Sequence, residues 1–123
     1  MKLRIKGNTI RFRLTQTEID QVREGFVEDK TQFPGGNSLI YRIEKGDLFN
    51  VQYTKDTVLI SVPSAIINDW ATTDTVSISK KIPLTNGDLL DLSLEKDFQC
   101  LTERPNEDES DMFPNPLEKH NKC

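Results

Sequence analysis

Hydrophobic and polar residues alternate one by one in short runs along most of this chain, which predicts a fold built largely from half-buried strands. The first two runs, 2–6 and 9–14, are joined by Gly7-Asn8. This dipeptide suits a two-residue hairpin turn, because glycine takes the positive φ that the first turn position requires. A turn of this length fixes the register and puts the apolar side chains of both runs on one face. We therefore expect an antiparallel hairpin at the start of the sequence.

The predicted hairpin gathers five basic side chains on its other face. Its register puts Arg4 opposite Arg11 and Lys2 opposite Arg13, and like charges directly opposite one another destabilise a strand pair. The whole chain has a net charge of −4, so this positive charge is local. Three interpretations stay open: a solvated face, a face neutralised by the chain's own carboxylates, or a binding surface for an anion. The candidate ligand-binding residues are Lys2, Arg4, Lys6, Arg11 and Arg13.

Two short helices are predicted between the runs of strand. Thr15-Gln-Thr-Glu18 matches a capping box, and Gly25 suits a helix C-cap, so we expect a helix over residues 16–24. A second helix is expected to begin after Pro63 with Ser64 as its cap. Trp70 lies on the inward side of that helix, and we expect it to be a core or lid residue because tryptophan is highly buried on average.

The middle of the chain predicts a three-stranded antiparallel meander. Alternation over 39–43, 49–53 and 58–62 is interrupted by Lys45-Gly46-Asp47 and by Lys55-Asp56, which both fit short hairpin loops. With loops of these lengths, only apolar residues face one another in both strand pairs, and Gly46 takes a left-handed conformation. The pattern therefore favours strands that are neighbours in both sequence and space.

A last hairpin is expected at Asn86-Gly87, with a strand over 75–81 before it and an alternating run of leucines after it. A two-residue loop would put Leu90 opposite Pro83. Proline cannot donate to a strand ladder, so we expect a bulge or an edge position there.

These elements predict an α+β protein: an antiparallel curled sheet or partly open barrel of about seven strands with two short helices. A weak polar strand over 27–33 is included, and we find no internal repeat in the sequence. The 123 residues suffice for one modest core, so we expect a single globular domain over 1–116 and a flexible tail over 117–123. No apolar run is long enough to span a bilayer and no signal-peptide pattern is present, which favours the cytoplasm.

Acidic residues gather between Pro105 and Pro114, where regular structure is not expected. Charge runs of this kind are usually solvated. Met112 and Phe113 follow the acids and would allow this segment to dock on the body of the protein. The basic face of the hairpin is the obvious complement for such a docked segment.

The chain resembles a family of small bacterial proteins of unknown function in two stretches, "KLRIKGNTIRFRLT" and "EKDFQCLTERPNEDESDMFPNP". The resemblance implies that both ends of the sequence belong to the domain, and it supplies no activity. It also implies that the C-terminal stretch is a family motif, which gives a second candidate cluster. The residues of this cluster are Cys100, Arg104, Glu107, Asp108, Glu109 and Asp111.

The residues favour no catalytic group, metal or cofactor. The one histidine, His120, stands close to the end of the sequence, and its spacing to Cys100 and Cys123 is not that of a zinc site. The acidic stretch "NEDESD" lacks the spaced ligands and central glycine of a calcium loop. No phosphate loop or dinucleotide fingerprint is present either.

We expect a non-enzymatic binding module whose basic face takes an anionic small molecule or an acidic protein. The alternative is a small metal-assisted enzyme on phosphorylated substrates, similar in type to the triphosphate tunnel metalloenzymes. Those enzymes carry a Glu-x-Glu-x-Lys pattern on an early strand, and this chain has no acid there. Nucleic-acid binding is the third candidate, disfavoured by the net charge of −4. No membrane partner is expected, and the sequence predicts no oligomeric state.

Overall fold

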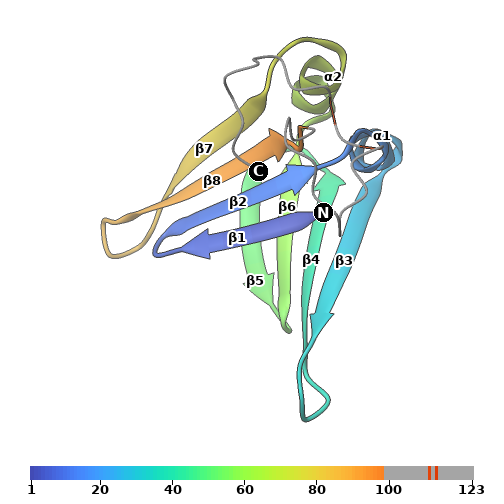
Figure 1. Ribbon diagram of the computed structural model, residues 1–123. Coiled ribbons are helices and arrows are strands. Elements are labelled where there is room, and N and C mark those ends of the chain that lie inside the picture. The colour runs from blue at the N-terminus through green and yellow to red at the C-terminus, as the bar shows by residue number, and fades with distance from the viewer. Residues whose placement is uncertain (99–110, 112, 114–123) are drawn as a thin grey trace.

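The computed structural model describes residues 1–98, 111 and 113. Within this part of the chain it is an α+β fold of two helices and eight strands, arranged as two four-stranded sheets (Figure 1). The helices are α1 (Gln16–Glu24) and α2 (Ser64–Thr72). The strands are β1 (Lys2–Lys6), β2 (Thr9–Leu14), β3 (Phe26–Gln32), β4 (Ser38–Lys45), β5 (Asn50–Thr54), β6 (Thr57–Val62), β7 (Ser77–Pro83) and β8 (Leu89–Lys96).

Both sheets are mixed, which corrects the expectation of about seven antiparallel strands. One sheet has the order β1-β2-β8-β7 and the other β3-β4-β6-β5. In each sheet two antiparallel hairpins meet at a central parallel pair, β2 with β8 and β4 with β6. The sheets diverge below the two helices and do not close into a barrel (Figure 1).

The opening hairpin and α1 form as predicted. β1 and β2 pair antiparallel with Arg4 opposite Arg11, and Gly7 has a φ of 55°. α1 carries the predicted capping box, in which the Thr15 side chain accepts from the Glu18 amide and the Glu18 side chain accepts from the Thr15 amide. The Glu18 carboxylate also forms an ion pair with the α-amino group of Met1, so the start of the hairpin is fastened to the helix.

The predicted meander is wrong at its first strand pair. β5 and β6 pair as expected, with Val51 opposite Ile60 and Tyr53 opposite Val58. β4, however, lies between β3 and β6 and runs parallel to β6. An alternating strand needs a partner with a matching buried face, and that requirement does not specify which strand supplies it. The chain therefore passes the end of β6 before it turns into β5.

Gly46 has no side chain, and this allows the chain to pass close to the end of β6. Its amide donates to the Val62 carbonyl at 2.9 Å, and a Cβ at Gly46 would lie 2.8 Å from the Cβ of Ser61. Gly46 is not among the residues with positive φ, so the left-handed conformation expected for it is wrong. The glycine is needed here for close packing rather than for a turn.

Two smaller expectations also change. α2 begins after Pro63 with no side-chain cap, so Ser64 is not the capping residue. β7 and β8 pair with Pro83 opposite Leu89, one residue away from the register of a two-residue loop. β7 is an edge strand, which is where a proline is tolerated.

The chain contains an internal repeat, which corrects the expectation that it has none. β1-β2-α1-β3-β4 and β5-β6-α2-β7-β8 follow the same path, and each hairpin of one half pairs with a hairpin of the other. The halves are related by a shift of 48 residues from Gln16 to Ser64 at the helices, and of 51 from Ser38 to Leu89 at the last strands. The two sheets are therefore equivalents of one another.

Backbone hydrogen bonds at the ends of the elements repeat in both halves. Two hydrogen bonds of the first half each have an equivalent in the second half, and equivalent bonds have the same length. The donor–acceptor distance is 2.9 Å in the first pair of bonds and 3.0 Å in the second. The first pair is Gly46 N to Val62 O and Asp97 N to Leu14 O; the second is Lys45 N to Gly25 O and Lys96 N to Val76 O. Such agreement indicates one structural unit used twice.

The core lies between the sheets and under the helices, and both halves contribute equivalent side chains. Trp70 of α2 is fully buried, as expected, and its Nε1 donates to the Val76 carbonyl at 3.2 Å. Val22 occupies the same position in α1 and is also fully buried. Further equivalent buried pairs are Phe12 with Ile60, Leu14 with Val62, Ile19 with Ile67, Tyr41 with Leu92 and Ile43 with Leu94.

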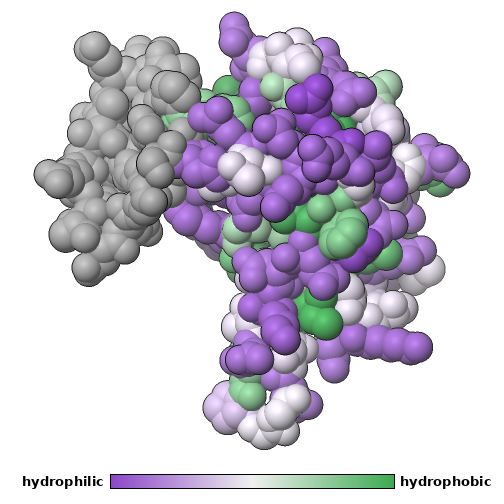
Figure 2. All heavy atoms as spheres, turned by 90° about the vertical axis from the view of Figure 1, so that its right-hand side faces the viewer, coloured by the Kyte–Doolittle hydropathy of each residue, from purple (hydrophilic) through white to green (hydrophobic). Residues whose placement is uncertain are grey.

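The face of the molecule that carries β3 is mainly hydrophilic. In Figure 2, charged and polar side chains cover most of the face that carries β3, with a small hydrophobic patch at its centre. Neither α1 nor α2, the helices within the described residues, is long and apolar enough to cross a membrane.

Asp111 returns to the first helix. Its backbone carbonyl accepts from the Gln16 amide at 3.1 Å, and its Oδ1 accepts from the Thr17 hydroxyl at 2.8 Å. Phe113 packs against Phe98 with ring centroids 6.0 Å apart. The free amides at a helix N-terminus favour a carboxylate, so Asp111 caps α1 from a distant part of the chain.

We expect Asp111→Asn to lower the free energy of unfolding by about 0.3–1 kcal/mol at neutral pH, because the amide oxygen can still accept hydrogen bonds but no longer carries the negative charge that a helix N-terminus favours. Hydrogen bonds from the side chains of Thr15 and Thr17 hold the pKa of Asp111 below its usual value. Because the folded-state pKa is the lower one, this stability is present above the unfolded-state pKa and is lost as the pH falls through the folded-state pKa. Melting temperatures of both proteins should therefore converge at acidic pH. Asp47→Asn, at an exposed aspartate between β4 and β5, is the control and should follow the wild type.

We expect Gly46→Ala to destabilise the protein by about 1–3 kcal/mol, because the new methyl group would overlap Ser61 in a packed site. Ser61→Gly removes the atom that it meets. Denaturant unfolding of the two single variants and the double variant forms a cycle. The double variant should cost less than the two single changes added together, and strict additivity would contradict the contact.

Candidate anion-binding face

The five basic residues predicted as candidates lie on the outer face of the sheet β1-β2-β8-β7. They alternate with residues that point to the core, such as Phe12 and Leu14, and all five are exposed. The register places Arg4 directly opposite Arg11, and Lys2 opposite Arg13. We call this set the basic face: Lys2, Arg4, Lys6, Arg11 and Arg13.

One carboxylate in β8 and one just after it neutralise one end of the basic face. Lys2 Nζ lies 3.3 Å from Asp97 Oδ2, and Arg13 Nε lies 3.4 Å from Glu95 Oε1. Asp97 itself is only 4 % exposed, so its charge is held close to the sheet. These partners are more than eighty positions away along the chain, and the parallel pairing of β2 with β8 brings them into place.

The other end of the basic face keeps its charge. No carboxylate among the described residues forms an ion pair with Arg4, Lys6 or Arg11. The pairing partner of Arg11 on β8 is Ser93, which is neutral, and Asp91 stands beside Thr9 in the register. The opposed arginines therefore face each other without a described counter-ion.

These side chains surround a small hollow of about 180 Å³, which is lined by Arg4, Lys6, Thr9 and Arg11. Two guanidinium groups and one ammonium group offer only donors, and the threonine hydroxyl can donate as well. Such a set matches the oxygens of a phosphate, sulfate or carboxylate group. Thr9 was not among the residues singled out from the sequence, although the predicted register already placed it opposite Lys6.

The internal repeat shows that the fold does not require this charge. In the second half of the chain, β5 and β6 occupy the positions of β1 and β2 with the same antiparallel register. None of their five equivalent residues is charged. In place of Lys2, Arg4, Lys6, Arg11 and Arg13 these strands carry Asn50, Gln52, Thr54, Leu59 and Ser61.

Asp111 is the one member of the second candidate cluster that lies among the described residues. Of the two outcomes left open for this segment, a solvated run or docking on the basic face, Asp111 shows neither: it hydrogen bonds to Thr17 of α1. The reason is that the amides at the start of α1 compete for the same carboxylate. The remaining members lie outside the described residues: Cys100, Arg104, Glu107, Asp108 and Glu109.

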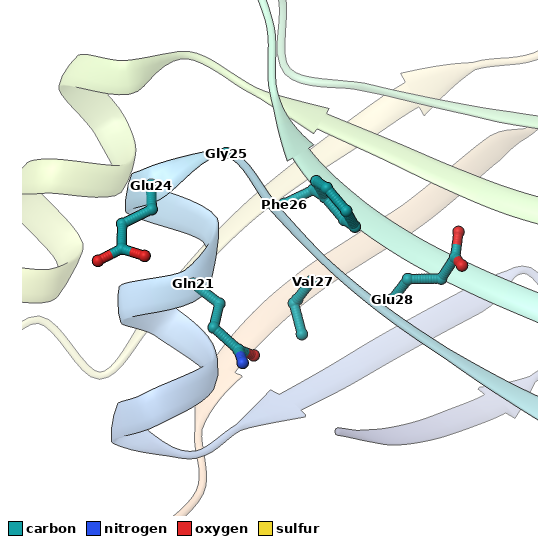
Figure 3. A pocket seen from close by; sticks show the side chains of 6 residues that line it. All are labelled: Gln21, Glu24, Gly25, Phe26, Val27 and Glu28. Atoms are coloured by element: carbon teal, nitrogen blue, oxygen red, sulfur yellow. The ribbon is translucent and has the colours of Figure 1, made fainter.

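A larger hollow of about 500 Å³ lies beside the end of α1 and the start of β3. Figure 3 shows that its two carboxylates, Glu24 and Glu28, point away from one another rather than toward a common centre. Phe26 between them lies under the Arg42 guanidinium, whose carbon is 3.6 Å from the ring centroid. Within the described residues no three acidic, histidine or cysteine side chains come together as metal ligands.

The tunnel of a triphosphate enzyme has no counterpart in this part of the chain. Both sheets are open, and their inner faces are filled by the apolar core. The basic residues lie on an outer face rather than inside a barrel. The likeness in type to tunnel metalloenzymes is thus not supported by the fold.

Comparison with known proteins gives a family and no function. No curated protein and no solved structure matches the chain. One family model covers residues 1–117, which include both the basic face and Asp111. The chain therefore belongs to the family of unknown function DUF7009.

Proposed function

We propose that this protein is an anion-binding module and that the anionic group of its ligand lies among Arg4, Lys6, Thr9 and Arg11. The observation that carries the proposal is the uncompensated charge at this hollow, in a position where the equivalent strands are neutral. A ligand with a phosphate, sulfate or carboxylate group, either a small molecule or an acidic protein, would supply the missing counter-ion.

The energetics support a bound anion. Like charges directly opposite on two strands disfavour the fold, and this effect is largest when the charges are not screened. An anion between two guanidinium groups converts that repulsion into charge-assisted hydrogen bonds, which are about twice as strong as neutral ones. Arginine suits this task because its planar donors match the oxygens of phosphate and carboxylate.

The first test removes the repulsion. Arg4→Gln with Arg11→Gln should raise stability at low ionic strength by roughly 0.2–1 kcal/mol, because it removes an opposed like-charge pair. The gain should shrink as salt is added, since the charges are exposed and salt screens them. Chemical denaturation at low and high salt measures both effects. A loss of stability at every salt concentration would show that the arginines serve the fold.

The second test measures binding. Thermal stability is followed during titration with sulfate, inorganic polyphosphate and nucleotides at constant ionic strength. An anion present at ten times its Kd stabilises the folded state by about 1.4 kcal/mol, which raises the Tm by a few degrees. We expect at least one of these anions to raise the Tm of the wild type, and none to raise that of the Arg4→Gln, Arg11→Gln variant.

The control for both tests is Lys30→Gln with Lys55→Gln, which removes one exposed cation from β3 and one from the turn between β5 and β6. This variant has the same net charge as the double arginine variant, so it reports general charge effects. It should respond to anions as the wild type does. Equal responses of all three proteins would exclude a specific site at the hollow.

A further inference from the structure

β1 is an edge strand with a free side. It pairs with β2 and with no other strand of the described residues, and Figure 1 shows it at the margin of its sheet. An edge strand presents unpaired backbone N–H and C=O groups, which can accept one more strand. Extended peptides bind to many proteins in this way, with the backbone giving affinity and alternate side chains giving specificity.

The two faces of β1 differ in chemistry. Its outer side carries Lys2, Arg4 and Lys6, and its inner side carries Leu3 and Ile5. A strand added along the free edge would continue this alternation, with every second side chain beside the basic row and the others on the inner side. A partner strand should therefore carry acidic side chains on its outer side and apolar side chains on its inner side.

An apolar groove lies on the inner side. It has a volume of about 460 Å³ and separates β1 from the hairpin formed by β3 and β4. Phe33 and Leu39 line it from that hairpin, and Leu3 and Ile5 from β1. Ile5 is 54 % exposed and Phe33 51 %, so much of this apolar surface is open.

We propose that the free edge of β1 binds an extended segment of a partner protein in which acidic and apolar residues alternate. The acidic side chains pair with the basic row, and the apolar ones enter the groove. The inference rests on the proposed function, because it assigns the anionic groups at the basic face to a protein strand.

The charges decide between this partner and two others. A second copy of β1 would bring two basic rows together, and like charges on neighbouring strands repel. The chain's own acidic run at 107–111 contains no apolar residue to enter the groove. An acidic strand from another protein meets neither objection, and the same charges reject neutral or basic strands.

The experiment uses a seven-residue peptide, Glu-Val-Glu-Ile-Glu-Val-Glu with blocked ends, and the full chain. Binding is measured by fluorescence anisotropy, and backbone protection in β1 by amide hydrogen exchange. A peptide of the same composition with its acids and apolar residues in two separate blocks is the first control. A peptide N-methylated on alternate amides, in two versions that block opposite edges, is the second.

We expect the alternating peptide to bind and to protect β1 amides, and the block peptide to bind at least tenfold more weakly. One N-methylated version should lose binding and the other should keep it, because only one edge of the peptide joins β1. Phe33→Ser should weaken peptide binding several-fold and leave the Tm shift caused by sulfate or polyphosphate unchanged, because it alters only the groove.

Three results would overturn the inference: no binding of the alternating peptide, equal binding of the block peptide, or indifference to both N-methylated versions. If any of them occurs while small anions still raise the Tm of the wild type, the proposed function stands and only the strand partner is excluded. If small anions also have no effect, both proposals fail.

Discussion

The structure depends on the pairing of its two halves. Each half is a pair of hairpins joined by a helix, and its strands find their central neighbours only in the other half, through the parallel pairs β2/β8 and β4/β6. Neither sheet is complete within one half, so the hydrophobic faces of the hairpins are covered only when both halves are folded. Hydrophobic burial is the main favourable contribution to folding, which makes this mutual pairing the constraint that positions every other element.

The repeat explains why the sequence predicted local structure well and strand partners badly. A hairpin turn such as Gly7-Asn8 and a capping box such as Thr15–Glu18 carry their information within a few residues, and both formed as expected. The choice of β6 rather than β5 as the neighbour of β4 depends on two strands that meet only in the folded chain. The two halves share patterns of burial rather than identities, as Trp70 in the place of Val22 illustrates, so the repeat escaped a reading of the sequence.

In the candidate site, too, the local features were predicted and the contacts between distant segments were not. The composition of the basic face followed from one turn and one register, and the structure places its five residues together on the outer face. Neutralisation by the chain's own carboxylates was one of the open interpretations, but Glu95 and Asp97 could not be named as the partners, because they are brought to the face by a parallel strand distant in the sequence. Asp111 illustrates a competition that charge alone does not reveal: the amides of α1 hold this carboxylate through hydrogen bonds.

A repeated unit also offers an internal comparison that a single sheet cannot. Positions buried in one half are mostly buried in the other, because the core must be filled on both sides of the molecule. The outer faces are free of that requirement, and it is there that the halves differ, with arginine at positions 4 and 11 against glutamine and leucine at positions 52 and 59. Since both faces are built on equivalent strands with the same register, the fold does not require the charges of Arg4 and Arg11. Under the proposed function, binding of an anion is the requirement that acts on one outer face and leaves its equivalent neutral.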